Sequence, residues 1–354
     1  MQPDTVFMRM SPGRRLHAGA MRFGWGLLLG LALAPGLLFA QAPERAVKIS
    51  RMGMLYAGGR EISTSTQRGG AQTQWAEQAL VHYLFPENIT YPHPIVMVPG
   101  LGLTSYLYLG TPDQRPGWAQ TFASEGFAVF VFDEPNNAVS GFNVGPFAAA
   151  RSGETDPRQM PQFTLWSNES VWRNWGIGPE SGVFFEDSKY PKDIVQLQRS
   201  MTPVFGDGTG GRFGFETKAA ALIDLLQRTG PAVLVLHSAA GMTGFEAARR
   251  RPDLVKGIVV VEPVGCPEEA ADVIRMLGGG EKFFYGVFGD HFEVRGMQGR
   301  LDACEETARL AAAAGARASV TWLPREGIRG NTHLLMQDTN SDDIAMRIVR
   351  FIRP

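Results

Sequence analysis

The sequence predicts an α/β fold, with a doubly wound, mostly parallel sheet and an inserted cap, and two observations lead to this prediction. Short buried-strand patterns alternate with helical patterns, most regularly from Thr217 onward, as is typical of crossover connections between parallel strands. Residues 134–216, in contrast, lack a buried-strand pattern and are rich in glycine and proline. Because a structureless stretch of this length is uncommon in a compact domain, we expect a cap over a functional site.

The N-terminal residues have the pattern of a signal peptide. Arg14, Arg15 and Arg22 precede an apolar stretch from Phe23 to Phe39, and Ala40 supplies a small residue at a cleavage site. An uncleaved anchor is the alternative, but the stretch is shorter than the ~20 residues that a span requires and contains Pro35. We therefore expect a signal peptide over residues 1–40, export to the periplasm or beyond, no membrane span after cleavage, and one domain over residues 41–354.

The domain is expected to open with a hairpin and to continue with strands and helices in turn. The hairpin would pair residues 47–55 with residues 60–64 around Ala57-Gly-Gly. A helix over residues 117–125 is closed by Gly126. Further strands are predicted at residues 95–98, 127–132, 232–237, 257–261, 283–288 and 318–323, and an amphipathic helix at residues 342–352.

Composition and charge restrict the classes of function. The chain has 354 residues, of which 44% are hydrophobic, and this is enough for one large core. Its formal net charge of −1 creates no field that would recruit nucleic acid or an anionic membrane. A small-molecule substrate is therefore the expected partner.

A strand, a sharp turn and a helix follow one another in Ala232-Val-Leu-Val-Leu-His-Ser-Ala-Ala-Gly241. In α/β-hydrolases the nucleophilic serine lies at such a turn, within Gly-x-Ser-x-Gly, because the strained backbone needs small residues two before and two after it. Here those positions are Leu236 and Ala240, of which only the second fits. Ser238 is a candidate nucleophile, with a helix-capping serine as the alternative.

The general base is expected after Ser238 in the sequence, because α/β-hydrolases present nucleophile, acid and histidine in that order. Only His291 and His333 follow Ser238. His333 lies in a polar, glycine-containing loop between a late strand and the last helix, which is the expected place for the base. A surface histidine without a catalytic role is the alternative.

Two carboxylates are candidates for the acid. Glu262 directly follows the strand at residues 257–261, the sixth by count, and Asp290 follows the seventh at residues 283–288. Either would lie at the catalytic edge of the sheet and could hold the imidazole tautomer. The residues themselves leave this choice open.

Six motifs follow one another along the chain: Val98-Pro-Gly-Leu-Gly-Leu-Thr104, Thr111-Pro-Asp-Gln-Arg-Pro-Gly-Trp118, His237-Ser-Ala-Ala-Gly241, Val261-Glu-Pro-Val-Gly-Cys266, Phe288-Gly-Asp-His291 and Gly330-Asn-Thr-His-Leu-Leu-Met-Gln-Asp338. In these motifs, and from about Val47 onward, the chain resembles the secreted bacterial α/β-hydrolases of the Alcaligenes esterase 713 type. The resemblance implies that Glu262 is the acid, so that the triad is Ser238, Glu262 and His333, with Asp290 as the alternative acid. It also suggests a homodimer.

The two cysteines, Cys266 and Cys304, are expected to form a disulfide bond. An even pair in an exported chain indicates a bridge more readily than a metal site, which would need further ligands nearby. Two buried free thiols are the alternative. The resemblance favours the bridge, because similar family members pair cysteines at these places.

The predicted cap is rich in aromatic side chains, which would give an apolar acyl or aryl pocket. Individually, most of these rings are expected to pack in the cap's own small core instead. They are Trp166, Trp172, Trp175, Phe184, Phe185, Phe205 and Phe213.

Together these features predict a serine carboxylesterase that hydrolyses small carboxylic esters through an acyl-enzyme, without a metal or an organic cofactor. The N–H of Ala239 is one expected oxyanion-hole donor, and the N–H of Leu101 is the other, with Gly102 as the alternative. An amidase, a lactonase or a perhydrolase would use the same triad. A catalytically inactive binding module is the alternative from another class.

Overall fold

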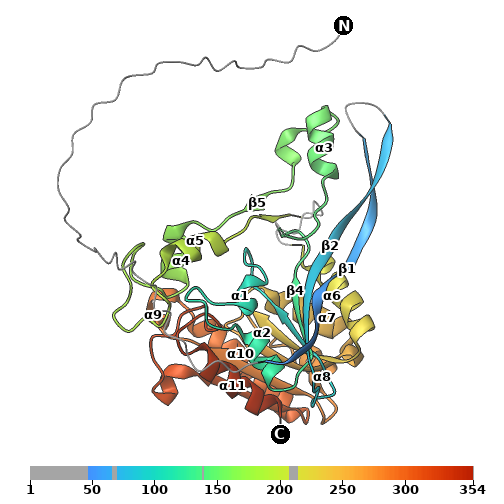
Figure 1. Cartoon of the computed structure of the whole chain (residues 1–354). Helices are drawn as coiled ribbons and strands as arrows, with labels where there is room; N and C mark the ends of the chain where they lie inside the picture. The colour runs from blue at the N-terminus through green and yellow to red at the C-terminus, as the bar shows by residue number, and fades with distance from the viewer. Residues whose placement is uncertain (1–46, 66–69, 138, 207–213, 354) are drawn as a thin grey trace, which may run out of the picture. The chain divides into compact units, whose positions relative to one another are not determined.

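The computed structural model describes residues 47–65, 70–137, 139–206 and 214–353 (Figure 1). All of them lie in the unit Glu44–Pro354, so the predicted signal peptide lies outside the described residues. None of the helices in the described ranges combines the length and the apolar character that a membrane crossing requires.

An eight-stranded sheet runs through this unit in the order β1-β2-β4-β3-β7-β8-β9-β10. β2 pairs antiparallel with β1 and with β4, and the other neighbouring strands are parallel. This arrangement confirms the predicted doubly wound, mostly parallel sheet. The strands are β1 (Ile49–Ser65), β2 (Ala71–Pro86), β3 (Ile95–Val98), β4 (Val129–Asp133), β7 (Ala232–His237), β8 (Val255–Val261), β9 (Phe283–Phe288) and β10 (Arg317–Trp322).

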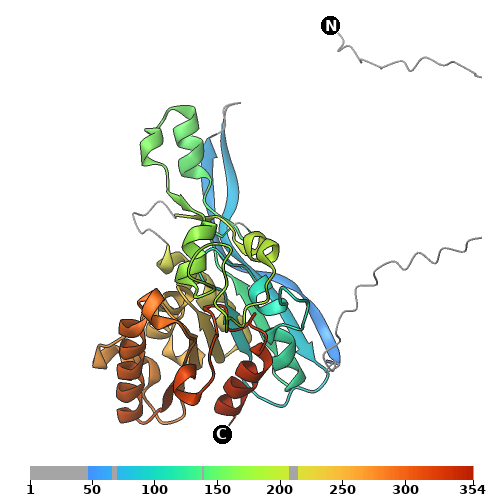
Figure 2. The ribbon, with the colours of Figure 1, turned by 90° about the vertical axis from the view of Figure 1, so that its left-hand side faces the viewer.

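Helices cover both faces of the sheet, as Figures 1 and 2 show. One face packs against α6 (Phe215–Thr229), α7 (Ala240–Arg250), α8 (Ala270–Leu277) and α10 (Gln298–Ala313). The other packs against α1 (Tyr106–Leu109), α2 (Trp118–Ser124) and α11 (Ser341–Ile352). Because both faces are covered, the central strands are mostly apolar, and β3 and β7 are fully buried. The shorter connecting helices are η2 (Pro252–Leu254), α9 (Phe292–Arg295) and η3 (Leu323–Glu326).

The first two strands differ from the predicted hairpin. β1 continues through Gly58 and Gly59, where the sequence predicted the turn, and β2 begins only at Ala71. Both glycines have positive φ, 65° and 88°, and a side-chain carbon on Gly58 would lie 2.6 Å from Ala221 of α6. The glycines therefore let the edge strand pass close to α6 instead of reversing its direction.

The segment predicted as a cap lies between β4 and α6. It contains α3 (Gly145–Ser152), η1 (Pro157–Gln159), α4 (Asn168–Asn174), α5 (Ile194–Ser200) and the short antiparallel pair β5 (Phe163–Thr164) and β6 (Val204–Phe205). α3 packs against β1, and the two project together from the body (Figures 1 and 2). Other parts of the segment lie at the carboxyl end of the parallel strands, where the N–H of Thr202 donates to the carbonyl of Gly102 over 2.8 Å.

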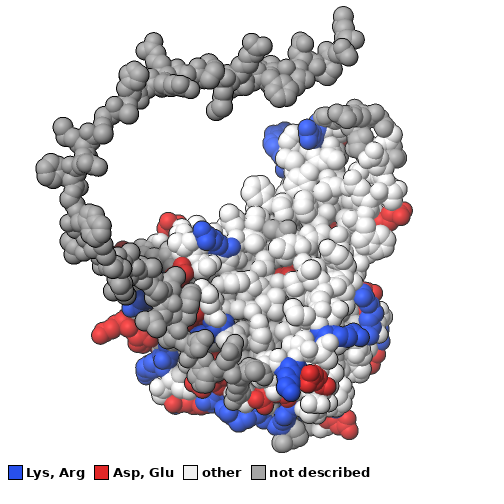
Figure 3. Space-filling view, in the orientation of Figure 1, with Lys and Arg blue, Asp and Glu red and all other residues white. Residues whose placement is uncertain are grey.

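Charged side chains of both signs are mixed over the lower part of the face shown in Figure 3, and the region of β1, β2 and α3 above them is mostly uncharged. The hairpin formed by β1 and β2 carries exposed apolar side chains, including Met52, Met54, Tyr56 and Trp75. The mixture of signs on this face agrees with the net charge of −1.

Candidate active site

Ser238 lies at a sharp turn between β7 and α7. Its φ of 54° is in the left-handed region, which residues other than glycine rarely adopt. The N–H of Ser238 donates to the carbonyl of Val261 over 3.0 Å, and its carbonyl accepts the N–H of Gly241 at 3.1 Å. Because Val261 directly precedes Glu262, the first of these bonds ties the turn to the strand that carries the predicted acid.

Two glycines accommodate the close packing around this turn. A side-chain carbon on Gly100 would lie 2.8 Å from Cβ of Ser238 and equally close to Nδ1 of His237. Leu236, which stands where the usual motif has glycine, is fully buried and faces Gly244 of α7. The departure from Gly-x-Ser-x-Gly is thus compensated on the helix that follows.

The ring of His333 is hydrogen-bonded to Glu262. Nδ1 of His333 lies 2.6 Å from Oε2 of Glu262, and both side chains are buried. Oε1 of Glu262 accepts the N–H of Gly289 at 2.7 Å, and a side-chain carbon on Gly289 would lie only 2.9 Å from this oxygen. Since an ionised carboxylate only accepts, we assign the ring proton to Nδ1, which leaves Nε2 able to accept a proton.

Arg295, the last residue of α9, is buried beside this pair. Its Nη1 donates to Oε1 of Glu262 at 3.0 Å, and its Nη2 donates to Oε2. Nη1 also donates to the carbonyl of Asp290 at 2.9 Å, and Nε donates to the carbonyl of Asn174 at 3.1 Å. Nη2 lies 3.3 Å from Nδ1 of His333. The guanidinium therefore contacts both the predicted acid and the predicted base.

These contacts set the protonation of the pair. Burial raises the pKa of Glu262, but the charge of Arg295 and hydrogen bonds from His333 and Arg295 outweigh it, so this pKa lies far below its ordinary value. Burial lowers the pKa of His333, Glu262 raises it, and Arg295 and Arg300 lower it again, with a lowered pKa as the result. Glu262 is thus ionised and His333 neutral near pH 7, as a general base requires.

His237, directly before Ser238, holds the backbone of His333. Its buried ring places Nε2 3.0 Å from the carbonyl oxygen of His333, and the two rings are 4.4 Å apart. A carbonyl only accepts, so His237 carries its proton on Nε2. Among the described residues the Ser238 hydroxyl makes no hydrogen bond to the ring of His333; such contacts are often long without substrate and tighten when it binds.

Asp290, the alternative acid, bonds to backbone groups. Its Oδ1 accepts the N–H of His291 at 2.8 Å, and its Oδ2 accepts the N–H of Gly330 at 2.9 Å. The hydrogen bond of the His333 ring goes to Glu262 instead. The geometry thus favours Glu262 as the acid, with Asp290 anchoring the loop that carries the histidine.

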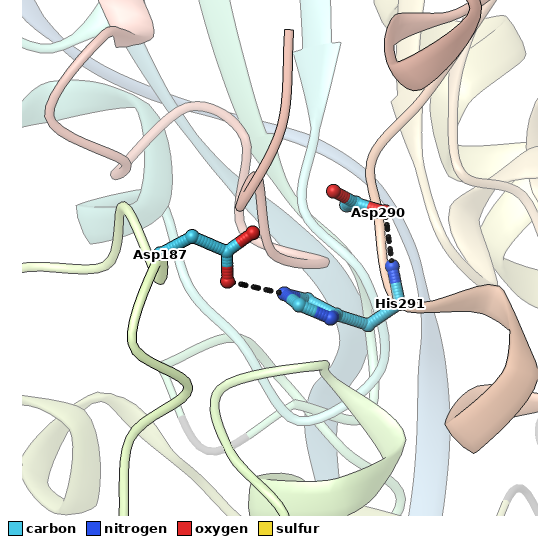
Figure 4. A group of neighbouring side chains, drawn as sticks. All are labelled: Asp187, Asp290 and His291. Atoms are coloured by element: carbon cyan, nitrogen blue, oxygen red, sulfur yellow. Dashed lines mark hydrogen bonds and ion pairs between the residues drawn. The ribbon is translucent and has the colours of Figure 1, made fainter.

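Asp187 from the cap segment completes a cluster with Asp290 and His291, drawn in Figure 4. Nε2 of His291 lies 3.3 Å from Oδ1 of Asp187, and candidate ligand atoms of the three residues lie within 4.8 Å of one another. Arg329 approaches Oδ1 of Asp290 to 4.0 Å. These contacts connect the cap segment to the histidine loop.

The loop from Asn331 to His333 is also held by Asp338. Oδ2 of Asp338 accepts the N–H of Thr332 at 2.8 Å and Nδ2 of Asn331 at 2.9 Å, and its Oδ1 lies 2.8 Å from Oγ1 of Thr332. Asp338 is fully buried, and burial raises its pKa to about 7 although these hydrogen bonds oppose the rise. The backbone next to the predicted base is therefore rigidly attached.

The N–H groups predicted for an oxyanion hole come from two elements. Ala239 directly precedes α7, and Leu101 and Gly102 follow β3; within the described ranges their N–H groups have no hydrogen-bond acceptor. The cap segment holds this loop, because Nε1 of Trp166 donates to the carbonyl of Leu101 at 2.7 Å and Thr202 bonds to Gly102. Free donors on a fixed loop suit an oxyanion hole.

Two tryptophans of the cap segment adjoin the site. The ring of Trp175 is centred 6.1 Å from the ring of His333 and 5.9 Å from that of Trp166. Other aromatic residues of the segment pack away from the triad: Trp172 against Phe184, Phe185 against His291 and Phe205 against Phe142. Phe213 lies outside the described residues.

The structure joins Cys266 and Cys304 in a disulfide bond. The bridge ties the loop after Glu262 to α10, between residues 38 positions apart in the sequence. It fastens the segment that follows the predicted acid.

A surface cavity of about 600 Å³ lies elsewhere, lined by residues of β1, β2 and α6. Ser238, Glu262 and His333 are not among its lining residues. The candidate site is therefore identified by its side chains and not by the size of a cavity.

Three residues that hold the candidate site in place were missed by the sequence prediction. His237 and Asp338 stand inside motifs that carry the family resemblance, and this position was their only signal. Arg295 lies in none of these motifs, and only the burial of its side chain beside Glu262 reveals its role.

Comparison with known proteins yields two informative similarities, and no protein-family model matches the chain. A curated protein described as probable secreted lipase phiG, from Fungal sp. (strain ATCC 74256), is 34% identical over 213 residues, which cover 59% of this chain. The match spans 55% of that protein, so the chain corresponds to about half of the relative's length. A solved structure described as a novel bacterial esterase is 27% identical, with a TM-score of 0.80, and the match covers 88% of this chain and 98% of that one.

Proposed function

Because this chain is an α/β-hydrolase, similar over most of its length to a bacterial esterase, we propose that it is a serine carboxylesterase acting on small carboxylic esters. Ser238 is the nucleophile, His333 the general base and Glu262 the acid. The observation that carries the proposal is the hydrogen bond of the His333 ring to Glu262, beside a strained serine turn.

The proposed reaction proceeds in two halves. Oγ of Ser238 attacks the ester carbonyl carbon while Nε2 of His333 takes the hydroxyl proton, and Glu262 stabilises the imidazolium. The N–H groups of Ala239 and Leu101 stabilise the oxyanion. The carbon–oxygen bond to the alcohol then breaks, and His333 returns the proton to the leaving alcohol. Water repeats the sequence on the acyl-enzyme and releases the carboxylic acid.

The acyl or aryl group of the substrate is proposed to lie against Trp166 and Trp175. The ring of Trp175 adjoins that of His333, and the ring of Trp166 adjoins that of Trp175. Aromatic walls favour apolar groups. The proposed location is the periplasm or the medium, after removal of a signal peptide over residues 1–40. The disulfide bond and the secreted lipase among the relatives support export. A homodimer remains a prediction.

A fluorophosphonate probe tests the proposal, since it reacts with activated serines. We expect one label per chain, located on Ser238 by peptide mass spectrometry, together with hydrolysis of p-nitrophenyl esters. Ser238→Ala should abolish both, whereas Ser319→Ala, which removes an exposed hydroxyl from β10, should change neither.

Parallel assays distinguish the alternatives. Faster turnover of anilides or lactones than of matched esters would assign the triad to an amidase or a lactonase. Labelling of no serine would indicate an inactive binding module. Full activity in Ser238→Ala would refute the assignment of the nucleophile.

A further inference from the structure

Arg295 directs four of the five N–H groups of its guanidinium at acceptors around the predicted triad. A guanidinium has five N–H donors, and four acceptors surround this one: both oxygens of Glu262 and the carbonyls of Asp290 and Asn174. Nη2 also lies against the protonated Nδ1 of His333. The side chain is 0% exposed. These bonds hold the buried guanidinium in one orientation. It contacts Nδ1 of His333, the atom that is hydrogen-bonded to Glu262.

This position alters the electrostatics of the base. In a serine hydrolase triad, the negative charge of the acid stabilises the imidazolium that forms when the histidine takes a proton. Here Glu262 and Arg295 form a pair with no net charge, and Nη2 of Arg295 lies 3.3 Å from Nδ1 of His333. A proton on His333 therefore gains less from the carboxylate and is repelled by the guanidinium.

The other charged groups near His333 do not reverse this balance. Arg300 of α10, half-buried, adds a second positive charge that lowers the pKa of His333. His237 of β7 is neutral, because burial holds its pKa well below the ordinary value. Glu262 is the one carboxylate among the described groups that act on the His333 pKa, and it faces two arginines.

We infer that Arg295 is a positioning residue that keeps His333 unprotonated in mildly acidic medium, so that ester hydrolysis continues there. The inference rests on the proposed function. Arg295 acts through Glu262 and His333 and does not touch the substrate. If it were only a structural link between the cap segment and α9, its loss would lower stability without changing the acidity of the base.

The pH profile of kcat/KM separates these two roles. An uncharged p-nitrophenyl ester is followed from about pH 4 to 9 at the wavelength where nitrophenol and nitrophenolate absorb equally. At low pH, kcat/KM falls because His333 becomes protonated, and this fall is the acidic limb of the profile. In Arg295→Gln we expect the acidic limb to shift to higher pH by about 1 to 3 units, the usual effect of a charge at this distance. Arg295→Lys should shift it less, because the charge remains while the planar fork is lost.

Arg329→Gln is the matched control. It removes the same charge from the loop that carries His333, but its side chain is 66% exposed, so solvent screens it and the limb should not move. The rate of fluorophosphonate labelling at Ser238 provides the same profile without an ester. An unchanged acidic limb in folded Arg295→Gln would overturn the inference.

The wild-type protein supplies a measurement that does not depend on the folding of a variant, since breaking a buried ion pair is costly. ¹⁵N NMR of the imidazole nitrogens, assigned with His333→Gln, should give a His333 pKa below the ordinary 6.5. A value above this would also overturn the inference. Failure of the wild type to label at Ser238 at any pH would instead contradict the proposed function itself.

Discussion

Leu236 of β7 and Gly244 of α7 are complementary in size. A side-chain carbon on Gly244 would lie 2.1 Å from Cδ1 and 2.9 Å from Cγ of Leu236, and Leu236 is fully buried, so it cannot move aside into solvent. The nucleophile turn thus tolerates a large residue two positions before Ser238 because the next helix lacks a side chain opposite it.

Gly244→Ala should lower the free energy of unfolding by about 1 to 3 kcal/mol, because the added carbon collides with a buried side chain. In a Leu236→Ala background the same change should be neutral or stabilising, since the collision is gone and alanine favours the helix. Urea unfolding of the four proteins in this double-mutant cycle measures the coupling. Equal effects of Gly244→Ala in both backgrounds would show that the two residues do not constrain each other.

Glu262→Gln should lower kcat by several orders of magnitude, whereas Asp290→Asn should leave most activity and mainly disturb the loop at Gly330. The amide keeps the shape of the acid but removes its charge and can trap the wrong histidine tautomer, which costs about ten-thousandfold in the reference serine protease. Both variants are compared on one p-nitrophenyl ester, with circular dichroism to confirm folding. The reverse ranking would move the acid to Asp290.

Asp338→Asn should remove a pH dependence of stability. Burial raises the pKa of Asp338 to about 7 from 3.8, so between these values the folded protein holds a proton that the unfolded chain has lost. The free energy of unfolding therefore falls as pH rises through this window, by about 1.4 kcal/mol for each pH unit that separates the folded and unfolded pKa values. An asparagine amide can donate to Oγ1 of Thr332 as a protonated carboxyl would.

Chemical denaturation at about pH 5 and pH 8 tests this linkage. The wild type should lose more stability between the two values than Asp338→Asn, which keeps the loop and its ester turnover. An equal loss in the two proteins would mean that Asp338 is ionised throughout, with its three hydrogen bonds dominating over burial.

Cys304→Ser should destabilise the protein by about 4 kcal/mol, the entropic estimate for closing a loop of this length, given the 38-residue separation of the two cysteines. Because the bridge starts four residues after Glu262, kcat should fall as the acid becomes less well held. Thermal unfolding with and without reductant measures the first effect. Two reactive thiols in the native, unreduced protein would show that the bridge does not form.

The central sheet could be predicted because its inner strands are short, mostly apolar and buried, as in β7. The edge hairpin could not, because glycines mark both a turn and a close approach between elements. At Gly58 the deciding contact comes from α6: Oδ2 of Asp224 accepts the N–H of Gly58 at 2.8 Å. A partner 166 residues away leaves no local pattern.

Among the site residues, too, some can be recognised from the local sequence and others only from contacts between distant segments. Ser238, Glu262 and His333 follow strand ends or a characteristic loop, where the order of the fold makes them visible in the sequence. Arg295 ends a four-residue helix outside every motif, and its importance arises from burial and charge alone. Such a residue becomes apparent only when the side chains are in place.

The pairing of β3 with β7, which joins residues 95–98 to residues 233–236, has a consequence for biosynthesis. The oxyanion loop and the nucleophile turn can meet only after more than half of the chain has left the ribosome, and His333 reaches Glu262 later still. Strand pairings between distant segments form slowly, because the intervening loop must be closed first. Hydrolytic activity is therefore among the last properties that a newly made molecule acquires.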